Sequence, residues 1–121
     1  MDLISSYVMQ LKEAHGFLEA TMADVTPEVA NFIPPGRANS VGACYAHVIC
    51  GEDLAINGML KGGAPLFVSS HLGKTGLLSG AGLGMRTVAW VLSRAVIGHA
   101  DNFSGEISAI KGVQGKKGYP A

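Results

Sequence analysis

Seven of the 17 glycines in this chain lie between residues 62 and 84, and this segment limits how many helices the sequence can form. It reads GGAPLFVSSHLGKTGLLSGAGLG and shows no sustained period of 3.6 residues, so we expect a long, partly packed loop. Structureless stretches of about twenty residues are unusual in small domains. The remaining sequence therefore has to supply the core from fewer helices.

Apolar residues recur every three or four positions in three other segments, which predicts three amphipathic helices. The first covers residues 2–23 with Asp2 as its cap, the second starts after Asn39 or Ser40 and ends near residue 61, and the third covers residues 85–111. Three prolines in 26–40 predict an ordered crossing loop. We expect an all-α bundle forming a single domain, residues 1–121.

The same spacing predicts which side chains face the core. The first helix presents Ile4, Val8, Leu11, His15, Leu18 and Met22 on one stripe, and the third presents Val88, Leu92, Ala95, His99, Phe103, Glu106 and Ile110. In the second helix Gly42, Gly51 and Gly58 are unfavourable by propensity. These glycines predict the close approach of another helix.

Charge and hydropathy exclude several classes of protein. Nine basic and nine acidic side chains cancel, and the basic ones form no stripe, so we expect no nucleic-acid partner. No apolar run reaches the roughly 18 residues of a membrane span, and the N-terminus carries no signal-like region. Cys44 and Cys50, six residues apart on one helix, are too far apart for a disulfide. The expected location is cytoplasmic, with free thiols and no membrane partner.

The histidines are the strongest candidates for chemistry. His47 and His99 lie on the second and third helices, and imidazoles that project from facing helices can bind Zn, Ni or Fe(II). The alternative is that each is a hydrogen-bonded core residue. A ligand four residues after His99 would complete a strong motif, but Phe103 stands there, and Glu106 is a weaker candidate. Cys44 precedes His47 by three residues, yet a buried thiol is favoured over a nucleophile.

Two segments together resemble the DinB-like superfamily of helical metalloproteins. ANSVGACYAHVICGEDLAINGML, residues 38–60, is similar to its second helix, and HADNFSGEISAIKGVQGKKGYP, residues 99–120, is similar to its last helix and tail. Residues 15–28 and the GKTG at 73–76 extend the likeness over most of the chain.

The resemblance implies an up-down-down-up four-helix bundle with a divalent metal, often Zn or Ni, held by three histidines. Carried over by position, His47 is the first ligand and His99 the second, while Phe103 occupies the place of the third. Glu106, His15, His71 or a water would have to complete the site. Relatives also have a further long helix before the last one, so this chain is shortened by about one helix.

The resemblance also implies a function. We expect a divalent-metal-binding protein of unknown substrate, a degenerate hydrolase or thiol transferase, with its metal weakly bound or absent. Its partner would be a small molecule or a low-molecular-weight thiol. The alternative is a non-catalytic binding or structural homodimer with a vacant metal site. A second copy would cover the gap left by the missing helix, with Gly51, Ala55 and Gly58 as the close contact.

Overall fold

The structure, a computed structural model, describes residues 2–66 and 88–118. These residues are helical apart from short connections, so the expected all-α fold is confirmed. The helices are α1 (Leu3–Met22), α2 (Pro27–Asn31), α3 (Val41–Asp53) followed by η1 (Leu54–Leu60), and α4 (Val88–Trp90) followed by η4 (Val91–Ile97) and α5 (Gly98–Val113). The two η segments are π-helical. Most of the glycine-rich loop, His71, the GKTG stretch and the expected helix start near residue 85 lie outside the described residues.

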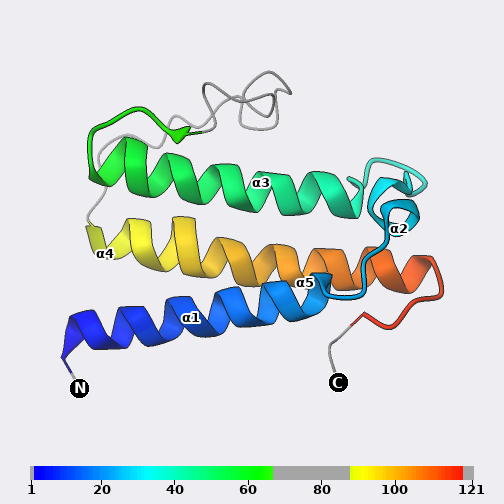
Figure 1. The fold of residues 1–121 in the computed structure, drawn as a ribbon, viewed down its shortest axis with the longest axis horizontal. Coiled ribbons are helices and arrows are strands. Elements are labelled where there is room, and N and C mark those ends of the chain that lie inside the picture. Colours follow the sequence, from blue (N-terminus) through cyan, green and yellow to red (C-terminus); the bar gives the residue numbers. More distant parts are fainter. Residues whose placement is uncertain (1, 67–87, 119–121) are drawn as a thin grey trace.

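The three long helical segments lie side by side, with α5 between α1 and α3 (Figure 1). The first and last run in the same direction, and α3 runs opposite to both (Figure 1). Within the described part of the chain, no helix combines the length and the apolar character needed to cross a membrane.

Side-chain caps fix where the helices begin. The Asp2 carboxylate accepts a hydrogen bond of 2.7 Å from the Ser5 amide, and the Ser40 hydroxyl accepts one of 3.2 Å from the Ala43 amide, so both predicted caps are confirmed. The crossing loop was predicted to lack a helix, and this was wrong. Thr26 caps the short α2, whose first residue is Pro27, the position at which proline costs a helix no hydrogen bond.

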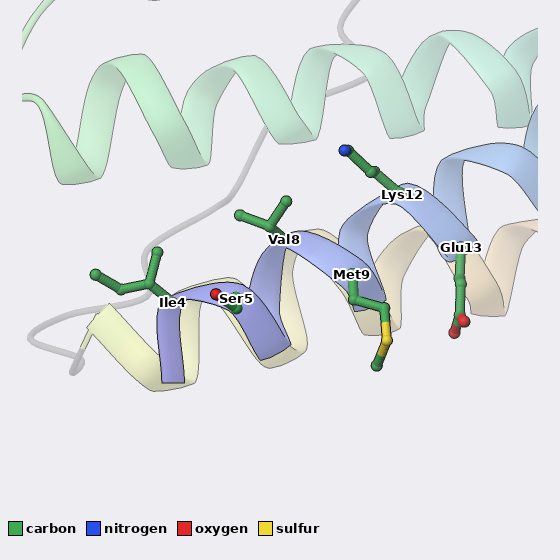
Figure 2. Close-up of a pocket in the computed structure, with 6 residues that line it drawn as sticks. All are labelled: Ile4, Ser5, Val8, Met9, Lys12 and Glu13. Carbon is green, nitrogen blue, oxygen red and sulfur yellow. The ribbon is translucent and has the colours of Figure 1, made fainter. Parts of the chain in front are cut away.

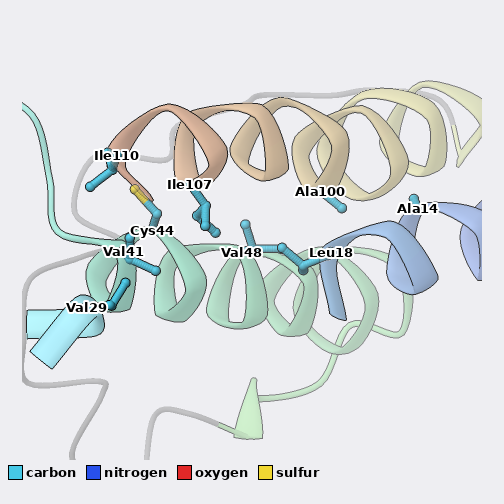
Figure 3. Close-up of a cluster of buried hydrophobic side chains, with 9 residues drawn as sticks. All are labelled: Ala14, Leu18, Val29, Val41, Cys44, Val48, Ala100, Ile107 and Ile110. Carbon is cyan, nitrogen blue, oxygen red and sulfur yellow. The ribbon is translucent and has the colours of Figure 1, made fainter. Parts of the chain in front are cut away.

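One buried cluster joins four helices, and we call it the main core. Figure 3 shows side chains of α3 and α5 facing each other, with α1 closing one side and α2 one end. The main core consists of Ala14, Leu18, Val29, Val41, Cys44, Val48, Ala100, Ile107 and Ile110.

The last turn of α5 and the tail that follows it hold this end of the bundle together. Lys111 is 2% exposed, and its ammonium donates to the Thr21 carbonyl at 2.8 Å and to the Asp24 carboxylate at 2.6 Å. Gln114 donates to the Val29 carbonyl, so the tail also holds α2. The Ser108 hydroxyl donates to the Gly118 carbonyl, so the tail folds back on α5. We call these contacts the C-terminal clamp.

The opposite end of the bundle is less covered. Leu3, Ile4, Val8 and Met9 of α1 are 69%, 77%, 46% and 42% exposed. The predicted stripe of α1 is therefore wrong at Ile4 and Val8, because no described element packs over them. A smaller cluster around Ala55, Val91 and Val96 joins η1 and η4 here.

The predicted stripe of the last helix is also wrong at Val88, whereas Ala95 packs against the smaller cluster. Val88 is exposed, and the buried line instead passes through Val91, Val96, Ala100 and Ser104. The step of five residues from Val91 to Val96 falls within the π-helical η4, whose hydrogen bonds link residues five apart. The wider turn rotates the preceding residues away from the face that a uniform α-helix predicts.

The glycines of α3 and η1 lie against other residues of the chain. A side chain at Gly42 would meet the Ala30 carbonyl of α2 at 3.1 Å, and one at Gly51 would meet the His99 ring at 3.0 Å. Ala55 is buried in the smaller cluster, and Gly58 lies against Leu54 and Pro65. The expected close approach is confirmed at Gly42 and Gly51. Because Gly51 and Ala55 are enclosed within the chain, the expectation that these two residues contact a second copy is wrong, and the expected contact at Gly58 stays a prediction.

Candidate functional site: a triangle of three rings

His47, His99 and Phe103 form a triangle of rings between α3 and α5. Their ring centroids are 4.9 Å apart for His47 and His99, 4.9 Å for His47 and Phe103, and 4.8 Å for His99 and Phe103. The rings meet at interplanar angles of 60°, 55° and 72°. The structure therefore brings together the two predicted histidines and the residue at the predicted third-ligand position.

The dimensions of this triangle can be compared with those of a metal centre. Zn–N bonds are about 2.0–2.1 Å, so imidazoles sharing one tetrahedral ion have ring centroids about 5 Å apart. His47 and His99 are close to that separation. Phe103 is nearly equidistant from both and occupies the third corner, where its phenyl ring offers no ligand atom. The described residues thus do not supply the three-histidine set that the family resemblance implies.

Gly51 determines where the His99 ring can lie. The position of a Cβ on Gly51 would be 3.0 Å from Cε1 and 3.3 Å from Nδ1 of His99, closer than ordinary packing allows. Because glycine has no side chain, the imidazole can lie directly against the α3 backbone. On α5, His99 and Phe103 are one turn apart and project to the same side.

The His99 imidazole favours its neutral form. Its pKa is lowered from the ordinary value, first by burial and then by repulsion from His47. Protonating His99 would place a positive charge beside the His47 ring in a poorly solvated position. A neutral imidazole can accept a hydrogen bond or coordinate a metal through one nitrogen.

Glu106 interacts with Cys44 rather than with the histidine pair. Burial raises the pKa of the Cys44 thiol to about 12, with repulsion from Glu106 and a hydrogen bond to its carboxylate as further causes. The thiol is therefore protonated near neutral pH, and the Cys44–His47 nucleophile is not supported. Cys50 is also buried with a raised pKa, and both cysteines are free, as expected.

His15 forms a contact between α1 and α3. Its Nε2 lies 2.5 Å from the Glu52 carboxylate. The neighbouring Asp53 accepts from the Asn57 side chain at 2.7 Å and from the Leu66 amide at 3.0 Å. The acidic pair after His47 therefore connects α3 to α1 and to the turn after η1. In residues 2–66 and 88–118, no three His, Cys, Asp or Glu side chains converge as a metal-binding group.

Sequence reasoning missed the buried Lys111 and treated the tail only as the end of the fold. A lysine inside KGVQGKKG, next to glycines that permit a sharp turn, was a usable signal: Gly115 has a φ of +72°. Within residues 111–118, this motif positions α1 through Lys111 and α2 through Gln114.

No family model, curated protein or solved structure matches this chain.

Proposed function

We propose that this chain is a DinB-like helical protein whose metal centre has been closed by Phe103, and that it acts as a non-catalytic binding or structural homodimer. The observation that carries the proposal is the ring triangle. Its three centroid separations of 4.8–4.9 Å suit three ligands around one ion, but one corner is a phenyl ring. At these separations the rings touch, so hydrocarbon packing takes the place of an open coordination position.

The helix directions support the DinB-like part of the proposal. An up-down-down-up bundle without its third helix would leave the first and last helices parallel and the second antiparallel, as α1, α5 and α3 are (Figure 1). The residues that carried the resemblance also have definite roles, because Glu52 and Asp53 secure α3, and Lys111 and Gln114 form the clamp. Two buried, free cysteines are in keeping with a cytoplasmic location.

The homodimer is supported by the uncovered apolar side chains of α1, from Leu3 to Met9. Contiguous apolar surface of this kind usually marks a site of association.

Metal binding by Phe103→His tests the closed centre. The variant places a third imidazole one turn after His99, so its affinity for Zn or Ni should exceed that of the wild type by at least about tenfold. Calorimetry on protein without a histidine tag measures this difference. Asn102→His is the matched control, because it adds an imidazole to an exposed position of the same helix. Equal affinity for both variants would show that the triangle is not a former metal centre.

A second candidate function is weak binding of Zn or Ni by His47 and His99 alone. The observation that favours it is their 4.9 Å centroid separation together with the lowered pKa of His99. A small molecule or a low-molecular-weight thiol would then be the partner. Stoichiometric metal in wild-type protein purified without a tag would favour this candidate, and loss of the metal in His99→Gln would assign it to the pair.

A further inference from the structure

We infer that two copies of this chain associate through the first three turns of α1, packed antiparallel about a two-fold axis near Val8. This inference rests on the proposed homodimer and names its surface, which is not the α3 face that the sequence suggested.

The surface consists of two parallel rows of side chains. Figure 2 shows Ile4, Val8 and Lys12 along one edge of a shallow hollow, and the row Ser5, Met9 and Glu13 lines its other edge. Residues four apart form the ridges of a helix, and the space between two such rows is the groove that another helix's ridge can enter. Four apolar side chains from Leu3 to Met9 are exposed on this part of α1.

A second hollow lies on the other side of the Ile4–Val8 ridge. It has a volume of about 200 Å³ and is lined by apolar side chains of α1 and η4, with only carbon surface exposed. The lining residues are Ile4, Tyr7, Val8, Leu11, Leu92, Val96 and Ile97. One ridge between two hollows is self-complementary, because the ridge of each copy can enter a hollow of the other.

The charges at the ends of the surface favour a second copy in the antiparallel orientation. With the axis near Val8, Lys12 of one copy lies opposite Ile4 of the other, within side-chain reach of the partner's Asp2. The pKa of Asp2 is lowered by hydrogen bonds from Ser5, so this residue is an anion at neutral pH. A partner surface that carries only positive or only negative charge would be repelled by Lys12 or by Glu13, respectively.

Cysteine cross-linking tests both the surface and the orientation. Val8→Cys places a thiol on the axis, so mild oxidation at micromolar concentration should convert most of the protein to a disulfide-linked dimer. Leu3→Cys is the orientation control, because two residues each five positions from the axis are about 15 Å apart along antiparallel helices, too far for a disulfide. Ile33→Cys is the surface control, exposed but outside α1. Cys44 and Cys50 are buried and do not compete.

The outcomes separate this inference from the homodimer itself. Sedimentation equilibrium of the wild type should give about twice the 12.5 kDa chain mass. In Val8→Glu the dissociation constant should rise at least about tenfold, because a carboxylate would be buried in the interface. A wild-type dimer that neither Val8→Cys cross-links nor Val8→Glu weakens would overturn the surface and leave the homodimer intact. A wild-type monomer would overturn both, and cross-linking of Leu3→Cys would overturn the antiparallel arrangement.

Discussion

The two ends of this bundle are built from the same helices, yet they differ in how completely those helices are covered. At one end, α2 and the C-terminal clamp close over the main core, and Lys111 satisfies the carbonyl of Thr21 at the end of α1. At the other end, α1 exposes Ile4 and Val8, and the neighbouring segments are π-helical. The ring triangle lies between the two ends. On one side of His99 in the sequence Ala100 belongs to the main core, and on the other side Val96 belongs to the smaller cluster.

The difference between the two ends shows that an amphipathic stripe is not sufficient for burial, because another element must also pack against it. Leu18 and Ile4 belong to the same helix and the same predicted stripe, but only Leu18 is buried, because α3 and α5 both pack near it. Stability should therefore be concentrated at the clamp end, while the other end remains available for association.

The strongest test compares two isoleucines. Ile107→Ala removes a fully buried side chain from the main core and should lower the free energy of unfolding by about 2–5 kcal/mol, because it combines lost burial with a cavity. Ile4→Ala makes the same chemical change at an exposed position and should alter it by about 0.5 kcal/mol or less. Urea titration of dilute, dissociated protein measures both. Similar losses would contradict the distinction between the two ends.

The clamp should contribute less than the core, but measurably. Lys111→Met keeps much of the apolar stem and removes the ammonium that satisfies Thr21 and Asp24, so we expect a loss of about 1–3 kcal/mol. Lys117→Met is the control, because this lysine is exposed, and its effect should stay within about 0.5 kcal/mol. Thermal or urea unfolding distinguishes them. If Lys111→Met were neutral, the clamp would not be what secures α1.

Two glycines test the packing at the ring triangle. Gly51→Ala gains helix propensity but pushes a methyl group against His99, so a net loss of about 1 kcal/mol is expected. Gly105→Ala on α5 has open space around its new methyl group, and a gain of about 0.5–1 kcal/mol is expected. Chemical denaturation gives the sign of each change, and the NMR signals of the His99 ring should shift in Gly51→Ala. A stabilised Gly51→Ala would contradict the close contact.

The smallest effect concerns pH. The pKa of Asp24 is lowered from 3.8 chiefly by its hydrogen bond to Lys111, so its contribution is present above pH 3.8 and is lost as the pH falls through the lowered value. In the wild-type background, Asp24→Asn should reduce the dependence of the unfolding free energy on pH at acid pH. In the Lys111→Met background, the same substitution should have no such effect. Asp2→Asn should reduce this dependence in both backgrounds, because Asp2 is held by Ser5 instead. Urea titrations between pH 2.5 and 5 test this, and an Asp24 effect independent of Lys111 would contradict it.

Local chemistry in the sequence determined where α1 and α3 begin. Asp2 and Ser40 are caps because their side chains reach amides three residues ahead, and this needs no tertiary partner. The helices predicted over 2–23 and up to residue 61 match α1 and the α3–η1 segment closely. The spacing of His47 and His99 on two helical faces likewise predicted that they would meet, and their rings do.

Only the tertiary structure decided which parts of those faces are covered. Periodicity identifies an apolar face but not its neighbour, so it could not separate the exposed Ile4 from the buried Leu18. Periodicity also did not predict the π-helical η4. A π-helical turn contains about one more residue than an α-helical turn, so it changes the register of every side chain that precedes it in the helix. Lys111 is buried because the Thr21 carbonyl and the Asp24 carboxylate, about ninety positions away in the chain, supply acceptors that compensate for its lost hydration.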